Sequence, residues 1–224
     1  MKMGSKRWRS ECGSVEIING DCRSVLPMIA DHGLTIAAVV ADPPYGCGKA
    51  DWDGDFFGEW YPLAKRLGAP VYTLTGSAGV KDALEMVGED FVDCISAQNL
   101  NGMTRGPLGF NNWISCVVSN GKPAIGGNAF SFVVKGEKPD HPSPKPLELM
   151  IKLVKRISNP GDLIVDPMMG SGTTGVACIK TGRKFIGIEV DPGYFGQVKK
   201  RLEDELKDGP LFVSQRQLDL GVDL

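Results

Sequence analysis

The stretch Leu163-Ile164-Val165-Asp166-Pro167-Met168-Met169-Gly170-Ser171-Gly172-Thr173-Thr174-Gly175 decides the fold. Its first residues form an apolar run that ends in an acid, which is typical of a buried strand. The three glycines that follow allow the backbone to approach a ligand closely at the start of a helix, which we expect to run through Cys178. The stretch therefore predicts a strand, a glycine-rich loop and a helix, with Asp166 at the carboxyl end of the strand.

On both sides of this stretch, short apolar runs alternate with segments of helical periodicity. The predicted strands are Val15–Ile18, Thr35–Val40, Val71–Leu74, Phe91–Ser96, Leu163–Asp166 and Phe185–Val190. The predicted helices are Glu59–Leu67, Gly79–Val87, Leu147–Ile157 and Tyr194–Leu206, and another helical pattern follows Asn19-Gly20-Asp21. This alternation predicts an α/β fold with a mostly parallel twisted sheet and flanking helices, within a single domain that covers residues 1–224.

The segment Ala97–Asp140 differs in texture from the rest of the chain. It is rich in Gly, Asn, Pro and Ser, and its two strand-like islands are Trp113–Val118 and Ala129–Val134. We interpret it as an insertion within the domain. Because Trp113 begins an apolar strand, we expect its side chain in the core. The alternative is that Trp113, like Phe110, stacks on bases or wedges between them.

Composition limits the classes of function. The 224 residues carry a formal net charge of −2, so no general basic field is available to hold nucleic acid, and binding would depend on local Lys and Arg side chains. The six cysteines are scattered and the two histidines are far apart, which predicts neither a disulfide framework nor a metal site. The chain has neither a signal peptide pattern nor an apolar run long enough to span a membrane, so we expect a cytoplasmic protein.

The second informative stretch is Ala41-Asp42-Pro43-Pro44-Tyr45-Gly46, which follows the predicted strand Thr35–Val40. Two prolines remove two N–H donors and stiffen the corner, which leaves the Asp42 carboxylate and the neighbouring carbonyls as acceptors beside the flat ring of Tyr45. Acceptors next to a stacking ring suit a planar group with an exocyclic amino group, such as adenine or cytosine. The alternative is a strand-ending turn without a ligand, because Pro and Asp are common turn residues.

The sequence of the glycine-rich loop is compatible with two alternative ligands. Gly170, Gly172 and Gly175 satisfy the G-x-G-x-x-G pattern, and Glu189 follows 19 residues after Gly170 at the end of the next strand, where an acid can bind ribose hydroxyls. A nicotinamide dehydrogenase fits that pattern. Asp166 instead favours a cationic ligand over a pyrophosphate, and S-adenosylmethionine carries a sulfonium, an amino group and a ribose.

Taken together, the motifs resemble those of the β-group of DNA amino-methyltransferases, enzymes that depend on S-adenosylmethionine. The resemblance rests on Asn19-Gly20-Asp21, Asp42-Pro43-Pro44-Tyr45, His141-Pro142-Ser143-Pro144-Lys145-Pro146-Leu147, the loop Asp166–Thr174 and Gly182–Glu189, in the order found in that family. It implies a Rossmann-like methyltransferase fold with a circularly permuted motif order. It also implies DNA as the partner.

The resemblance implies a role for each matching residue. Asp42, Pro43, Pro44 and Tyr45 would receive the target base. The cofactor would be held by Asp21 and the backbone at Cys22 at its adenine, by Glu189 at its ribose, and by Asp166, Gly170, Gly172 and Thr173 at its methionine, which Lys145 would close off. Met168 and Ser171 would also contact the cofactor. Met168 departs from the family, in which this position is usually aromatic. No metal is implied.

Side chains able to read base edges occur within Ala97–Asp140, and we single out Arg105, Asn111 and Asn112, with Gln98 and Asn101 as further candidates. Lys2, Lys6, Arg7 and Arg9 form a basic arm that either contacts DNA phosphates or is a solvated terminus without a ligand. The run Lys199-Lys200-Arg201 alternates with acids, and we interpret it as a solvated helix face.

These observations predict methyl transfer from S-adenosylmethionine to the exocyclic N6 of adenine in DNA, because Asp at the start of the Asp-Pro-Pro-Tyr motif goes mainly with adenine in this family, whereas Ser goes with cytosine N4. A cytosine-N4 enzyme is the first alternative. A nicotinamide-dependent oxidoreductase and a DNA-binding relative without activity are the alternatives from other classes.

Overall fold

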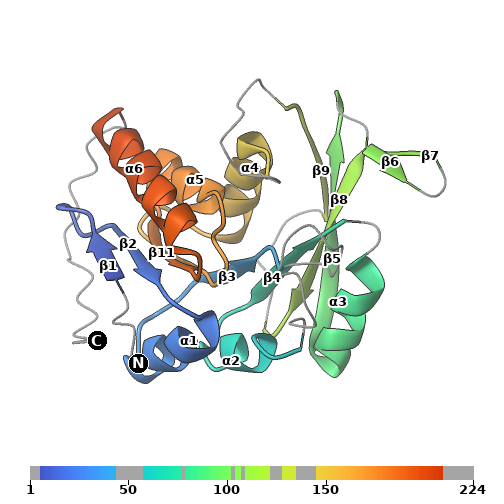
Figure 1. Cartoon of the computed structure of the whole chain (residues 1–224). Helices are drawn as coiled ribbons and strands as arrows, with labels where there is room; N and C mark the ends of the chain where they lie inside the picture. The colour runs from blue at the N-terminus through green and yellow to red at the C-terminus, as the bar shows by residue number, and fades with distance from the viewer. Residues whose placement is uncertain are drawn as a thin grey trace.

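The structure is a computed structural model that describes residues 6–43, 58–76, 79–101, 104–106, 109–121, 128–134 and 145–208. Its central element is a nine-stranded sheet with the order β1-β2-β11-β10-β3-β4-β8-β5-β9 (Figure 1). The strands are β1 (Lys6–Arg9), β2 (Val15–Asn19), β3 (Ala38–Ala41), β4 (Val71–Thr75), β5 (Phe91–Asn99), β8 (Trp113–Ser119), β9 (Ala129–Phe132), β10 (Leu163–Asp166) and β11 (Lys184–Glu189). A separate hairpin contains β6 (Thr104–Gly106) and β7 (Gly109–Asn111).

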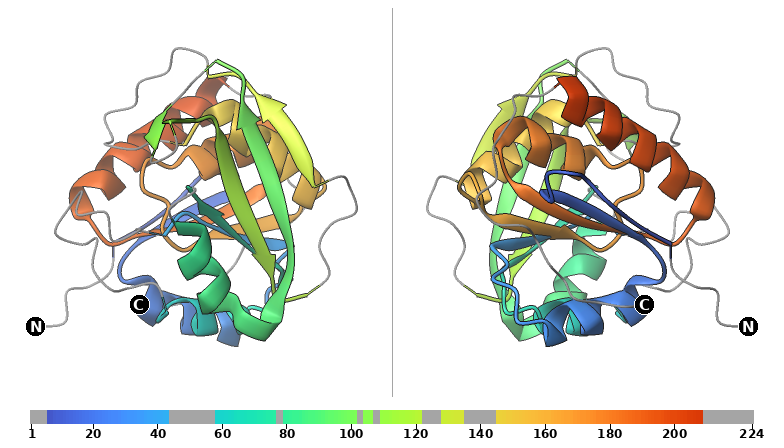
Figure 2. Two further views of the ribbon diagram at one scale, coloured as in Figure 1. Left: turned by 90° about the vertical axis from the view of Figure 1, so that its right-hand side faces the viewer. Right: turned by 90° about the vertical axis from the view of Figure 1, so that its left-hand side faces the viewer.

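The sheet is mostly parallel, as the alternating sequence pattern predicts. β1 and β8 are the strands that run antiparallel to their neighbours. The right-handed twist accumulates across the sheet, so that β5 and β8 are strongly rotated relative to β2 and β11 (Figure 2). The predicted α/β architecture is confirmed.

Helices cover both faces of the sheet. α4 (Leu147–Ile157), α5 (Thr173–Thr181) and α6 (Pro192–Asp208) lie on one face, and α1 (Cys22–Asp31), α2 (Tyr61–Lys65) and α3 (Val80–Val87) lie on the other (Figures 1 and 2). None of the described helices is long and apolar enough to cross a membrane.

The core consists of two apolar layers, one on each side of the sheet. Because side chains alternate along a strand, Val40 of β3 and Ile164 of β10 pack with α4 and α5, whereas Val39 and Val165 pack with the helices of the opposite face. This explains why the central strands are continuous apolar runs instead of alternating patterns: both of their faces are covered.

The connections between strands place a topological switch point at the middle of the sheet. From β10 the chain passes through α5 to β11 on one side, and from β3 it passes through α2 to β4 on the other. β10 and β3 are parallel neighbours, with Val165 opposite Val39. In open α/β sheets, ligands bind beyond the carboxyl ends of the strands at such a point.

The structure changes the interpretation of Ala97–Asp140. β8 lies between β4 and β5, and β9 pairs with β5, so both belong to the main sheet and not to an element inserted outside it. The expectation for Trp113 is wrong: it is 39% exposed, because the apolar run becomes buried only from Ser115 onward.

Two other expectations also need correction. α2 is shorter than the predicted helix Glu59–Leu67, and Pro62 lies in its first turn, where proline is tolerated. The described part of the basic arm is not a free terminus: it forms the edge strand β1, in which Arg7 pairs with the buried carboxylate of Glu16.

Candidate functional site at the carboxyl edge of the sheet

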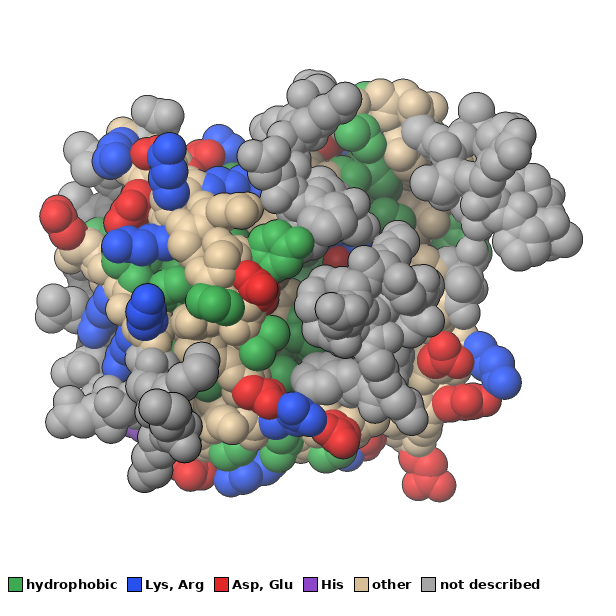
Figure 3. All heavy atoms as spheres, viewed as in Figure 1, with side chains coloured by type: hydrophobic (Ala, Val, Ile, Leu, Met, Phe, Trp, Pro, Cys, Tyr) green, Lys and Arg blue, Asp and Glu red, His purple; other side chains and the backbone are tan. Residues whose placement is uncertain are grey.

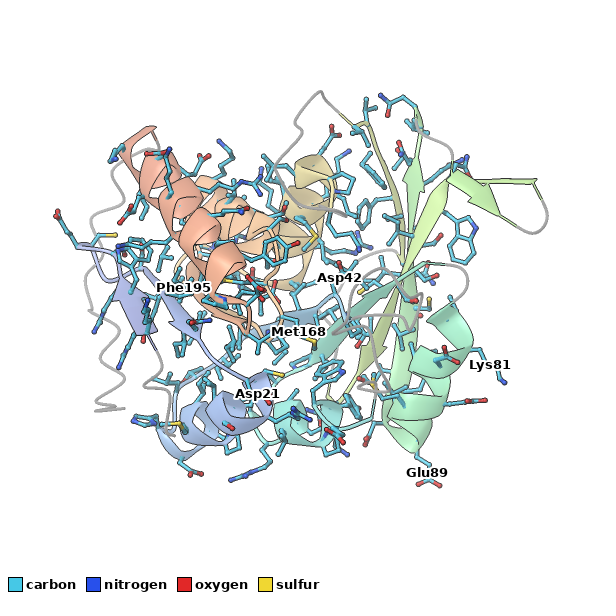
Figure 4. The ribbon with its side chains drawn as sticks, viewed as in Figure 1. Asp21, Asp42, Lys81, Glu89, Met168 and Phe195 are labelled. Atoms are coloured by element: carbon cyan, nitrogen blue, oxygen red, sulfur yellow. The ribbon has the colours of Figure 1, made fainter. Side chains whose placement is uncertain are left out.

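Asp42 and Asp166 lie on neighbouring strands at the switch point. Asp166 is the last residue of β10, and Asp42 follows β3 directly. Burial is the main cause that raises the pKa of Asp166, and the nearby charge of Asp42 adds to it. In Figure 4, Asp42 and Met168 lie in the middle of the view between the helical layers and Asp21 lies at the end of α1, whereas Lys81 lies on the outer side of α3 and Glu89 lies beyond its lower end.

The side chain of Asp42 is held by Lys145. The Lys145 ammonium lies 2.5 Å from Asp42 Oδ2 and donates a hydrogen bond to it. The resemblance implies a place for Lys145 at the methionine side of a cofactor, whereas the structure brings it to the carboxylate expected to receive the target base. Pro43 lies next to Asp42, and Pro44 and Tyr45 fall outside the described residues.

Asp166 is only 3% exposed. Burial raises its pKa to about 7, although hydrogen bonds from Thr174 Oγ1 to Oδ2 (2.6 Å) and from the Met168 N–H to Oδ1 (3.0 Å) act in the opposite direction. A buried carboxylate of this kind stabilises a cation placed beside it, because the cation offsets the lost hydration of the ionised form.

Glu189 ends β11 and is 8% exposed. Burial raises its pKa, and this effect is opposed by backbone N–H donors: Asp191 to Oε1 at 2.9 Å and Gly170 to Oε2 at 3.0 Å. Glu189 therefore fixes the first glycine of the loop. Each carboxylate oxygen has a second lone pair, so ribose hydroxyls can still be accepted there.

Glycine is required at three positions of the loop, for different structural reasons. Gly170 and Gly172 have φ values of 48° and 74°, a region that favours glycine. A Cβ at Gly172 would lie 2.6 Å from Val198 Cγ1 of α6, and one at Gly175 would lie 2.8 Å from the Phe185 ring. Gly170 and Gly172 therefore shape the turn, while Gly172 and Gly175 also permit close packing of the loop and α5.

Arg201 of α6 braces the same loop. Its Nη1 donates to the Ser171 carbonyl at 2.8 Å and lies 3.3 Å from Thr173 Oγ1, which in turn is 3.0 Å from Ser171 Oγ. The interpretation of this residue as part of a solvated face is wrong. In the sequence, the acids and bases that alternate around Arg201 do not indicate that it contacts the loop. Lys199, in contrast, does pair with Glu203 along the helix surface.

Asp21 and Cys22 lie at the start of α1, at the same edge of the sheet. Asp21 caps the helix by accepting from the Arg23 N–H at 2.9 Å, and the Arg23 guanidinium binds both of its oxygens, which holds the pKa of Asp21 below its usual range. Arg23 also pairs with Glu59 at 2.5 Å. Cys22 is buried, and burial raises the pKa of its thiol to about 12.

Met168 is half-buried and packs against the apolar layer that includes Ile18 and Cys22. It therefore lies between the strand end that carries Asp166 and the start of α1. This placement suits a wall of the cofactor site, although the thioether replaces the aromatic ring that is usual in the related family.

The residues expected to read bases have different structural environments. The Asn101 side chain exchanges two hydrogen bonds with the backbone of Val134, at 2.9 and 2.8 Å, so its amide supports the structure. Arg105 lies in β6 and Asn111 in β7, where Asn111 is opposite Thr104. Asn112 is half-buried, and its carbonyl accepts from the Asn99 N–H at 2.6 Å. Gln98 is exposed on β5.

Within the described residues, no group of three or more His, Cys, Asp and Glu side chains is arranged to hold a metal ion. Two residues that the sequence did not single out, Thr174 and Arg23, bind the proposed cofactor acids directly. A hydroxyl at the second residue of the helix after the loop is the signal that could have identified Thr174.

Comparisons with known proteins agree with this arrangement. A sequence model of the DNA methylase family matches residues 95–200. The DNA adenine methyltransferase YhdJ of Escherichia coli (strain K12) is 40% identical over 83 residues, which cover 35% of this chain and 28% of that protein. The chain thus matches less than a third of the length of this curated relative.

Solved structures match over most of the chain. The M1.HpyAVI–SAM complex has a TM-score of 0.68 at 26% identity and covers 84% of this chain and 98% of its own. The cytosine-N4-specific PvuII DNA methyltransferase has a TM-score of 0.63 at 16% identity, over 88% and 94% of the two chains, and this shows a shared fold. With the two motifs placed at one sheet edge, these findings show that the chain resembles the DNA amino-methyltransferases of the DNA methylase family.

Proposed function

We propose that the protein transfers a methyl group from S-adenosylmethionine to the exocyclic N6 of adenine in DNA. The observation that carries this proposal is the placement of Asp42 and Asp166 at the ends of two adjacent parallel strands that flank the switch point. One carboxylate belongs to the motif expected to receive a base, and the other belongs to the glycine-rich loop expected to hold the cofactor.

The residues of the loop fit S-adenosylmethionine. Asp166 is a buried acid whose pKa is raised by burial, and a cationic ligand relieves that cost, while the buried Glu189 can accept hydrogen bonds from ribose hydroxyls. The turn at Gly170 and Gly172 leads directly into α5, so backbone N–H groups are available at the helix N-terminus. When bound, the cofactor supplies a methyl group on a sulfonium.

Asp42 acts as the acceptor for the target amino group. Accepting its hydrogens increases the electron density on a nitrogen that is otherwise conjugated and weakly nucleophilic. Much of the rate enhancement then comes from holding this nitrogen in line with the methyl group, since proximity alone supplies about 7–11 kcal/mol in well-oriented reactions. A base in a duplex must be flipped out to reach the site, at a cost of a few kcal/mol.

Two features support adenine over cytosine. The motif begins with Asp, which in the resembling family goes mainly with adenine, and a relative with 40% identity over 83 residues is named a DNA adenine methyltransferase. The cytosine-N4 enzyme among the structural neighbours supports the fold alone. The nicotinamide alternative leaves Asp42 without a role, and the family match does not support it.

The test is incubation of the protein with labelled S-adenosylmethionine and mixed-sequence DNA, followed by nucleoside mass spectrometry. The proposal predicts N6-methyladenine as the labelled product. N4-methylcytosine as the labelled product would reject adenine as the target and support the cytosine-N4 alternative. The absence of any methylated nucleoside, with cofactor binding retained in calorimetry, would indicate a relative without activity.

A further inference from the structure

We propose that Lys145 is a positioning residue for Asp42, and that it acts on the base-receiving carboxylate and not as a ligand of the cofactor. This inference rests on the proposed function. Its starting point is the hydrogen bond of 2.5 Å between the Lys145 ammonium and Asp42 Oδ2, which joins residues 103 positions apart. The two side chains are only 16% and 27% exposed, so water screens the pair less than it screens a surface ion pair.

Both partners are anchored by rigid elements. Lys145 is followed by Pro146, the residue before α4, whose carbonyl accepts from the Met150 N–H at 3.2 Å, and α4 buries Leu149, Met150 and Leu153 against the sheet. Asp42 directly follows β3, whose four residues are all buried. The hydrogen bond therefore connects two fixed backbones across the carboxyl edge of the sheet, which limits the orientations that the Asp42 carboxylate can adopt.

The charges at this edge provide the physical reason for a lysine. Asp42 and Asp166 lie at the ends of two adjacent parallel strands, where their like charges repel one another, and the charge of Asp42 adds to the burial that raises the pKa of Asp166. An ammonium next to Asp42 offsets this repulsion and keeps the carboxylate directed by a charge-assisted hydrogen bond. Without it, Asp42 would lie near a second acid and would lose the contact that orients it toward the incoming amino group.

The alternative place for Lys145, at the methionine side of the cofactor, makes a different prediction. A cofactor ligand contributes to cofactor affinity whether or not Asp42 is present. A positioning residue acts through Asp42, so its effect should fall on the methyl-transfer rate and should disappear once Asp42 is removed. The two roles are therefore separated by a double-mutant cycle with two readouts.

The experiment compares Lys145→Met, Lys145→Arg, Asp42→Ala and the double variant Lys145→Met/Asp42→Ala with the wild type. Single-turnover methyl transfer gives the rate, and calorimetry gives the affinity for S-adenosylmethionine. Lys152→Met is the matched control, because Lys152 lies in α4, the helix that follows Lys145, and binds Glu148 and the Ser131 carbonyl instead of Asp42. We expect this control to retain the wild-type rate.

We expect Lys145→Met to lower the rate about 10- to 100-fold, the effect of losing one hydrogen bond to a charged group. Cofactor affinity should stay within about twofold, and adding Lys145→Met to Asp42→Ala should change the rate less than about threefold. Lys145→Arg, which keeps the charge, should recover part of the rate.

A tenfold or greater loss of cofactor affinity in Lys145→Met, repeated in the Asp42→Ala background, would overturn the proposal in favour of a cofactor ligand. A wild-type rate in Lys145→Met would overturn it as well. If Lys145→Met does not fold by circular dichroism, Lys145→Gln replaces it in the same cycle. Failure of the wild type to methylate DNA would reject the proposed function itself, which is a different result.

Discussion

Asp166 is a buried carboxylic acid whose ionisation opposes folding of the ligand-free protein. Its pKa in the folded state is about 7, above the ordinary value of 3.8, because burial disfavours the charged form. Below pH 3.8 the group is protonated in both the folded and the unfolded chain. Between these two values the unfolded chain loses the proton first, so the free energy of unfolding falls as the pH rises, and above pH 7 the penalty is constant.

This sign gives a prediction for Asp166→Asn. The variant should gain stability relative to the wild type as the pH rises from 5 to 8, since each unit of pKa shift corresponds to about 1.4 kcal/mol. Urea unfolding at both pH values measures the difference. Asp82→Asn, on the exposed side of α3, controls for the loss of one acid. An advantage of Asp166→Asn that is larger at pH 5 than at pH 8 would contradict the assigned burial cost.

At the scale of elements, the bounds of a helix or strand are predicted well where the residue pattern within the element and the residues that flank it agree. The helix Leu147–Ile157 and the strand Leu163–Asp166 have the predicted bounds, because strong periodicity or an apolar run ends at clear polar or Pro-Gly boundaries. The place of β8 between β4 and β5 could not be predicted, because strand pairing depends on partners distant in sequence. For the same reason the bracing of the loop by Val198 and Arg201 was missed.

The contact between the glycine-rich loop and α6 leads to a stability prediction. Gly172→Ala places a methyl group 2.6 Å from Val198 Cγ1 at a φ of 74°, so we expect a loss of about 2 kcal/mol or more from strain and overpacking. Gly196→Ala is the matched control, because Gly196 lies in α6 with nothing within 4 Å of the added Cβ.

We expect the Gly196→Ala variant to be neutral or more stable by up to about 1 kcal/mol, since alanine favours a helix. Thermal or urea unfolding of both variants measures the contrast. Equal stability of Gly172→Ala and Gly196→Ala would show that the loop does not pack against α6 as described.

At the scale of the whole molecule, the site depends on residues far apart in sequence. The two motif acids could be predicted to share an edge, since each ends an apolar run in a parallel sheet. The pairing of Lys145 with Asp42 could not, because it depends on how α4 docks onto the sheet. Charge is likewise a property of the whole surface: in Figure 3, Lys and Arg side chains over α6 and β1 are interspersed with Asp and Glu.

This mixed charge predicts weak dependence of DNA affinity on salt. With a net charge of −2, and with Arg7 already paired with Glu16, we expect only about three to six phosphate contacts. The logarithm of affinity against the logarithm of salt concentration should then have a slope of about −3 to −5. Fluorescence anisotropy with a labelled duplex measures it. A slope of about −8 or steeper would contradict the prediction, because it would require more phosphate contacts than three to six.

The central claim is that the edge formed by β3 and β10 is a methyl-transfer site in which Asp42 receives the amino group and Asp166 serves the cofactor. The most direct measurement is the single-turnover rate of methyl transfer to DNA by Asp42→Ala, with cofactor affinity measured on the same preparation. We predict a rate lower by about 10²- to 10⁴-fold, as for the loss of a positioned catalytic group, and nearly unchanged affinity. A rate equal to that of the wild type would contradict the claim.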